Sequence, residues 1–148
     1  MTLMPRILII DDHSPIVGLL KKFCIAENYE VETALSGAVG LRLVRETLPD
    51  LVLVDLKLGD MSGLDLLRTA KAEGCTSRFV FITGNAEVRT AVEAMKCGAS
   101  DYLTKPLDLD ELRRVITSVL EERAQGASNR KLILVYPKQS APRLAMAE

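Results

Sequence analysis

The sequence has few of the residues that a metal-stapled, membrane-spanning or nucleic-acid-binding protein requires. It contains one histidine and three cysteines, Cys24, Cys75 and Cys97, which show no Cys-x-x-Cys spacing. A structural zinc site is therefore excluded, and we expect reduced thiols. Lys plus Arg number 19 against 20 Asp plus Glu, so the chain lacks a basic footprint for nucleic acid. No stretch approaches the ~20 apolar residues of a spanning helix. We therefore expect a cytoplasmic protein that binds neither membranes nor nucleic acid directly.

Length and apolar content indicate one folded domain with its own core. The chain has 148 residues, of which 48% are hydrophobic. This is about one average domain, too short for a multidomain enzyme. A core of this composition can form without a metal or disulfide staple.

Two kinds of segment alternate along the chain. Segments between and after short apolar runs repeat their apolar residues at helical spacing, for example Ile16, Leu19, Leu20 and Phe23. Five strand–helix pairs result, which predicts a doubly wound α/β fold with a parallel sheet and five helices. The predicted strands are Arg6–Ile10, Glu30–Ala34, Leu51–Val54, Arg78–Thr83 and Asp101–Thr104.

Polar residues and glycines mark the expected helix ends. Ser, Thr, Asp and Asn favour N-caps, proline favours the first helical turn, and glycine favours the residue after a helix. We expect N-caps at Ser14 (followed by Pro15), Ser36, Ser62 and Asp108, and helix ends at Gly74 and Gly98.

The regular pattern ends near Arg123. We therefore predict a domain over residues 4–123 and a linker or tail over 124–148, which begins with a linker-like stretch at 124–129. This tail is shorter than the ~50 residues of a small domain. Its apolar segment, Leu132–Tyr136, has three interpretations: a strand that pairs with a partner, the edge of an output domain cut off by truncation, or a disordered tail. We favour the last two.

Chemically active side chains follow four of the five predicted strands. Asp11 and Asp12 follow the first, Asp55 the third and Lys105 the fifth, while Thr83 ends the fourth. Each alone has an ordinary interpretation as a turn, capping or solvated residue. Because the carboxyl ends of parallel strands lie on one edge of the sheet, we expect these side chains to lie together.

Three carboxylates at one edge need compensating charge. A close pair repels by roughly 4 kcal/mol at ~4 Å and an effective dielectric near 20. Mg²⁺ offsets such charge with oxygen ligands, and Lys105 adds a positive charge. A cation, a lysine and a hydroxyl around a carboxylate suit phosphoryl transfer, in which the carboxylate attacks phosphorus and becomes an acyl phosphate.

Over about residues 4–123 the chain resembles the receiver domain of two-component response regulators. The resemblance rests on the motifs at 6–12 (RILIIDD), 51–55 (LVLVD), 60–63 (DMSG), 81–84 (FITG) and 101–106 (DYLTKP). It implies a flavodoxin-like receiver fold with strand order 2-1-3-4-5. It also implies Mg²⁺ as cofactor and a signalling domain, not an enzyme, that assists its own phosphorylation and dephosphorylation.

The resemblance also implies roles for individual residues, most of them at strand ends. These roles are phosphoacceptor for Asp55, Mg²⁺ ligand for Asp11, Asp12, Asp55 and the backbone carbonyl of Lys57, switch hydroxyl for Thr83, rotating aromatic for Tyr102, phosphoryl-pairing lysine for Lys105, and a cis peptide bond before Pro106.

Phosphorylation is then expected to alter one surface. Thr83 would turn toward the phosphoryl oxygen and Tyr102 would swing inward, which changes the face formed by the helix around 88–95, the strand at 101–104 and the helix from 109. The implied partners are a sensor histidine kinase or phosphotransfer protein, a downstream effector or output domain, and a second copy in a homodimer.

Some positions depart from the family pattern. Lys57 stands where an uncharged residue is common, and Gly59 where proline is frequent. With Asn85, Lys57 would flank the acyl phosphate and tune its lifetime. Ala91 replaces an arginine often found at one type of dimer interface, which puts that dimer mode in question.

Three other classes of protein fit these residues less well. An aspartate-nucleophile phosphohydrolase usually spaces its two aspartates one residue apart, whereas Asp11 and Asp12 are adjacent. A flavodoxin-like carrier would need a Ser/Thr/Gly-rich phosphate loop after Ile10, which is absent. A pseudo-receiver that never accepts phosphate is disfavoured because the acidic, hydroxyl and lysine residues are all present.

Overall fold

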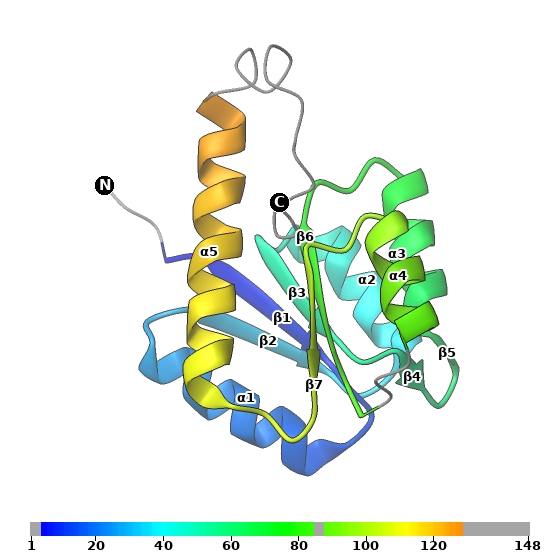
Figure 1. Ribbon diagram of the computed structural model, residues 1–148, viewed down its shortest axis with the longest axis horizontal. Coiled ribbons are helices and arrows are strands. Elements are labelled where there is room, and N and C mark those ends of the chain that lie inside the picture. The colour runs from blue at the N-terminus through cyan, green and yellow to red at the C-terminus, as the bar shows by residue number, and fades with distance from the viewer. Residues whose placement is uncertain (1–3, 85–87, 129–148) are drawn as a thin grey trace.

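A five-stranded parallel sheet forms the centre of the molecule, shown in Figure 1. The structure is a computed structural model that describes residues 4–84 and 88–128. The sheet has the order β2-β1-β3-β6-β7, which confirms the predicted 2-1-3-4-5 order. Its strands in chain order are β1 (Arg6–Ile10), β2 (Glu30–Ala34), β3 (Leu51–Val54), β6 (Arg78–Thr83) and β7 (Asp101–Thr104). All five predicted strands are confirmed with their bounds.

Five helices cover both faces of this sheet. Figure 1 shows α1 and α5 on one face and α2, α3 and α4 on the other. This arrangement confirms the doubly wound α/β prediction. The helices are α1 (Ser14–Ala26), α2 (Gly37–Thr47), α3 (Gly63–Ala72), α4 (Val88–Lys96) and α5 (Leu109–Ser128). Within the described ranges, none of them is long and apolar enough to cross a membrane.

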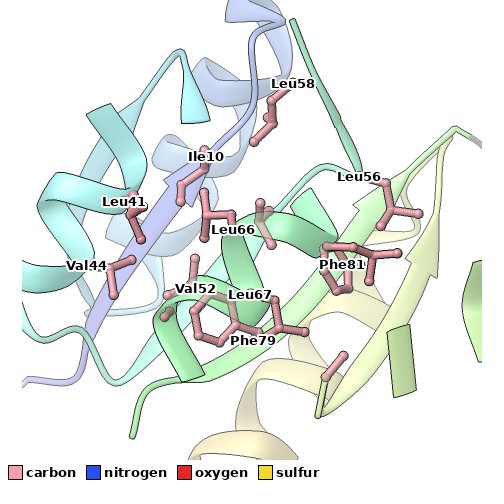
Figure 2. Packing of buried hydrophobic residues seen from close by; sticks show 14 of the residues in the cluster. Ile10, Leu41, Val44, Val52, Leu56, Leu58, Leu66, Leu67, Phe79 and Phe81 are labelled. Carbon is pink, nitrogen blue, oxygen red and sulfur yellow. The ribbon is translucent and has the colours of Figure 1, made fainter. Parts of the chain in front are cut away.

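Alternate residues of the inner strands enter two separate cores. Ile7 and Ile9 face α1 and α5, whereas Leu8 and Ile10 face α2 and α3. Figure 2 shows the second core, where Phe79 and Phe81 lie among leucines of α3. Because side chains alternate across a strand and both faces are covered, the inner strands β1, β3 and β6 are apolar except at their end residues Arg6, Arg78 and Thr83. Burial on both faces stabilises the sheet and thereby fixes the positions of its strand ends.

Most predicted helix ends are confirmed. The Ser36 hydroxyl accepts from the Val39 N–H at the start of α2, and Ser62 accepts from the first turn of α3. Asp108 accepts two N–H groups in the first turn of α5. Gly74 and Gly98 follow α3 and α4 with φ of 86° and 107°, a conformation that suits glycine.

The predicted cap at Ser14 is wrong. The N-cap of α1 is His13, whose backbone is extended, and Ser14 is already the first helical residue. The Asp11 carboxylate accepts the His13 N–H at 2.9 Å, and the His13 carbonyl accepts the N–H of Ile16. This turn starts the helix one residue earlier, and Pro15 still lies in the first turn.

A short antiparallel hairpin follows β3 and was not predicted. It consists of β4 (Lys57–Leu58) and β5 (Met61–Ser62), with Lys57 opposite Ser62 and Leu58 opposite Met61. Two-residue strands are too short to produce an alternating hydrophobic signal. The residues between the two strands, Gly59 and Asp60, form its turn and contact other parts of the molecule.

Helix α5 extends beyond the predicted end of the domain. It continues to Ser128, five residues past the point where the sequence predicts a linker or tail to begin. Arg123 connects α5 to the residues that precede β3 and β6. Its Nη1 lies 2.8 Å from Asp50 Oδ1, and its Nε donates to the Thr76 carbonyl. Ala124 and Gln125 are also compatible with helix, so the backbone continues. The apolar segment 132–136 and Asn85 lie outside the described residues.

Candidate functional site

The sheet brings Asp11, Asp55 and Lys105 together at its carboxyl edge. Strands β1 and β3 are neighbours, and their last residues, Ile10 and Val54, are partners in the ladder. Asp11 and Asp55 directly follow this pair. Lys105 follows β7, and its backbone N–H donates to the Thr83 carbonyl at 2.9 Å. The topology thus gathers side chains from three strands at one place.

A single ammonium group bridges the two buried carboxylates. Lys105 Nζ lies 3.0 Å from Asp11 Oδ2 and 3.0 Å from Asp55 Oδ2. Asp11 is 2% exposed and Asp55 8%. Burial lowers the pKa of Lys105, but hydrogen bonds and charge from the two carboxylates outweigh it, so the pKa is raised overall. Lys105 therefore stays charged, and the three groups together retain one negative charge.

Backbone donors orient the second oxygen of each carboxylate. Asp11 Oδ1 accepts from the His13 N–H at 2.9 Å, and Asp55 Oδ1 accepts from the Lys57 N–H at 3.2 Å. Each aspartate thus accepts from the amide two residues further on, as in an Asx-turn. Both carboxylates are held by a lysine on one oxygen and by the backbone on the other.

Asp12 occupies a different position. It is exposed, and its Oδ2 accepts from the Gly59 N–H at 3.1 Å in the turn of the hairpin. Within residues 4–84 and 88–128, no three His, Cys, Asp or Glu side chains are grouped closely enough to hold a metal ion by themselves. The expected meeting of three carboxylates is therefore only partly seen, with Asp11 and Asp55 bridged and Asp12 on the adjacent turn.

The donor chemistry of this edge fits Mg²⁺ without a three-carboxylate cage. Mg²⁺ usually binds through one or two carboxylates, several waters and a phosphate oxygen. The bridged pair keeps an uncompensated negative charge, and Asp12 adds an exposed carboxylate at the same edge of the sheet. Hard oxygen donors and excess negative charge are what this cation requires.

Thr83 and Tyr102 lie on the neighbouring strands. Thr83 is 2% exposed at the end of β6 and is paired in register with Thr104. Tyr102 is half-buried on β7, is paired with Phe81 and packs against the core on the α2–α4 face. The Lys105–Pro106 peptide bond is cis, the isomer that the resemblance implied.

Three further residues shape the site, two of which the sequence analysis assigned no role. A Cβ on Gly63 would lie 2.3 Å from the Asp55 carbonyl oxygen, so only glycine fits beside this backbone. The Gly59 N–H on Asp12 is a donor that proline, frequent here in the family, could not supply. Asp60 contacts the start of α2.

A separate cavity of about 450 Å³ lies at the opposite end of the sheet. Its lining includes Arg6, Asp50 and Leu120 and none of the strand-end residues Asp11, Asp55 and Lys105. The candidate site lies away from this cavity, at the carboxyl ends of the strands.

Comparisons with known proteins agree with this architecture. Residues 7–117 match the family model of the response regulator receiver domain. The regulatory protein AtoC of Escherichia coli K12 is 35% identical over 132 residues, which cover 89% of this chain and 29% of AtoC. A CheY-like receiver domain protein from Methanospirillum hungatei superimposes with a TM-score of 0.80 at 32% identity and covers 83% of this chain and 98% of that one. The beryllofluoride-activated NtrC4 receiver domain dimer superimposes with a TM-score of 0.77 at 28% identity. The match covers 81% of this chain and 99% of the NtrC4 chain.

The chain belongs to the response regulator receiver domain family. It is a two-component response regulator receiver, a signalling domain, as the sequence motifs indicated. Neither the phosphohydrolase nor the pseudo-receiver finds support in these comparisons. The chain spans less than a third of the length of AtoC.

Proposed function

We propose that this receiver accepts a phosphoryl group on Asp55 in a Mg²⁺-dependent reaction. The observation that supports this most strongly is the Lys105 ammonium at 3.0 Å from both Asp55 and Asp11. It supplies a positive charge beside the carboxylate at which negative charge grows during transfer. Of the two bridged aspartates, Asp55 is the one followed by the hairpin, and it is the more exposed of the two, at 8% against 2% for Asp11.

The proposed step is an attack by an Asp55 carboxylate oxygen on phosphorus. A new oxygen–phosphorus bond forms, and the bond to the leaving group breaks. The leaving group, acetate or a histidine nitrogen, keeps the electron pair. Asp11, Asp12, Asp55 and the Lys57 carbonyl are the groups proposed to hold Mg²⁺, which when bound neutralises charge on the phosphoryl oxygens. Lys105 can turn from the carboxylate pair to the phosphoryl group, which carries about two negative charges.

The phosphorylated state is proposed to change the surface of α4, β7 and α5. Thr83, at the end of the strand beside Lys105, would follow the phosphoryl oxygen, and Tyr102 would turn further inward. This surface exposes Val92 (47%), Met95 (46%) and Leu109 (39%). Phosphorylation shifts the population only by its difference in interaction with the two states.

Partners and location follow from the same proposal. The phosphoryl donor would be a sensor histidine kinase or phosphotransfer protein, and an effector or output domain would read the altered surface, in the cytoplasm. Because the similar beryllofluoride-activated NtrC4 receiver domain is a dimer, we include a homodimer in the proposal. In this proposal the receiver domain ends near residue 123, and residues 124–148 form a tail or a linker to an output domain. A role of Lys57 and Asn85 in tuning the phosphate lifetime is part of the proposal.

The test is incubation of the full chain with Mg²⁺ and acetyl phosphate, followed by intact mass and peptide mapping. We expect one phosphoryl group on Asp55, lost in Asp55→Ala and strongly reduced in Asp12→Asn or without Mg²⁺. Asp110→Asn is the control that keeps full labelling, since Asp110 is an exposed residue of α5 that forms an ion pair with Arg113. An unchanged mass, or labelling at Asp11, would refute the proposal.

A further inference from the structure

The hairpin at residues 57–62 supplies backbone donors to two of the acidic residues. The Lys57 N–H donates to Asp55 Oδ1 at 3.2 Å, and the Gly59 N–H donates to Asp12 Oδ2 at 3.1 Å. The end of the hairpin closes back on the start, because the Gly63 N–H donates to the Leu56 carbonyl at 2.7 Å. The position of this hairpin therefore influences where the Asp12 carboxylate lies.

One side chain in its turn, Asp60, attaches the hairpin to helix α2. Asp60 Oδ1 accepts from the Gly37 N–H at 2.8 Å, and Oδ2 accepts from the Ala38 N–H at 2.9 Å. These backbone donors hold the pKa of Asp60 below its usual range, so the carboxylate stays charged. The first amides of α2 are thus satisfied by a residue more than twenty positions away, next to the positive end of the helix dipole.

The contact between α2 and the hairpin is tight. A Cβ on Gly37 would lie 2.3 Å from Met61 Cγ and 2.8 Å from Met61 Sδ. The start of α2 therefore lies directly against the hairpin at both Asp60 and Met61. With α2 on one side and Asp12 on the other, the turn is fixed between two elements.

We propose that Asp60 is a positioning residue for the divalent-cation site. It holds the turn so that the Gly59 N–H stays on Asp12, and thereby fixes the Asp12 carboxylate for a cation. Gly59 makes this arrangement specific, since a proline there would have no N–H to donate. The inference rests on the proposed Mg²⁺-dependent phosphoryl uptake for its functional consequence, whereas the placement of Gly59 can be measured without it.

A competing explanation is that Asp60 only caps α2. The chain offers a matched control in Ser36. It also caps this helix, by accepting from the Val39 N–H at 3.2 Å, and among the described residues it makes no side-chain hydrogen bond to residues 57–62. Asp60→Ala and Ser36→Ala each remove a cap from the same helix end. Only Asp60→Ala releases the turn.

The experiment compares wild type, Asp60→Ala, Ser36→Ala and the milder Asp60→Asn. Mg²⁺ affinity is measured by calorimetry, and amide exchange of Gly59 by NMR in metal-free protein. We expect Asp60→Ala to weaken Mg²⁺ binding on the order of tenfold, as loss of an outer-sphere group does, and to speed Gly59 exchange. Asp60→Asn keeps one acceptor and should fall between wild type and Asp60→Ala.

Ser36→Ala should change neither readout. Equal Mg²⁺ affinities and equal Gly59 exchange in the Asp60 and Ser36 variants would overturn the positioning role. Wild type that binds no Mg²⁺ and takes up no phosphoryl group would instead overturn the proposed function, and Gly59 exchange would still decide whether Asp60 holds the turn. If Asp60→Ala does not fold, the comparison of Asp60→Asn with Ser36→Ala gives the same decision.

Discussion

Removal of the Lys105 ammonium is the perturbation whose cost can be worked most directly from the structure. Each of the two Oδ2 atoms lies 3.0 Å from Nζ, so the two oxygens are no more than about 6 Å apart. At an effective dielectric near 20, two unit charges at that separation repel by roughly 3 kcal/mol. In Lys105→Met this repulsion is uncompensated. The free energy of unfolding should therefore fall by about 3 kcal/mol, a large part of a typical domain's stability.

The loss comes from the carboxylate pair, so a second substitution should reverse it. Asp11→Asn removes one of the two charges but keeps an oxygen for the His13 N–H. The double variant Lys105→Met, Asp11→Asn should therefore regain most of the ~3 kcal/mol that Lys105→Met loses. If Mg²⁺ binds at this edge, millimolar Mg²⁺ should also stabilise Lys105→Met, since a ligand that binds only the native state shifts the equilibrium toward it.

Urea unfolding of metal-free protein, followed by far-UV circular dichroism, measures these differences. Lys22→Met, at an exposed position of α1, controls for the general effect of replacing a lysine. A Lys105→Met protein as stable as the Lys22→Met control would contradict the reasoning. So would a double variant that is less stable than Lys105→Met, because that result would mean the two carboxylates do not repel each other.

Because the folded pKa of Lys105 is raised, its stabilising contribution is complete below the unfolded value of about 10.4 and is lost as pH rises through the folded pKa. In urea titrations, the difference in unfolding free energy between wild type and Lys105→Met should thus shrink as the pH rises above about 10.4. Burial raises the pKa of Cys24 to about 12, with a smaller contribution from a nearby carboxylate, so a thiol reagent at pH 8 should modify only the other two cysteines until the chain is unfolded. Gly63→Ala should cost roughly 1–3 kcal/mol through collision with the Asp55 backbone, whereas Gly18→Ala, with open space at its Cβ, should be neutral or stabilising in thermal melts. Equal changes in stability for Gly63→Ala and Gly18→Ala would contradict the close approach of the Asp55 backbone to Gly63.

Local patterns were sufficient for most of the fold. The bounds of the five sheet strands were predictable because each is a short apolar or β-rich run, and all except β2 end at or just before a polar residue. The caps at Ser36 and Ser62 were predictable for the same reason, since a hydroxyl acts on amides within the next three residues. The cap at Ser14 was wrong because the Asp11 side chain and the His13 backbone together decide where α1 begins.

The sequence by itself determined which residues end the strands and therefore which could meet at the carboxyl edge. Only the tertiary structure decided that one lysine bridges two carboxylates 94 and 50 residues away, while Asp12 turns to the hairpin. It also decided that Asp60 closes the start of α2 and that α5 continues past Arg123. Strand identity depends on neighbouring residues and burial, which are encoded locally. Contacts between distant side chains depend on distances that exist only after the sheet has formed.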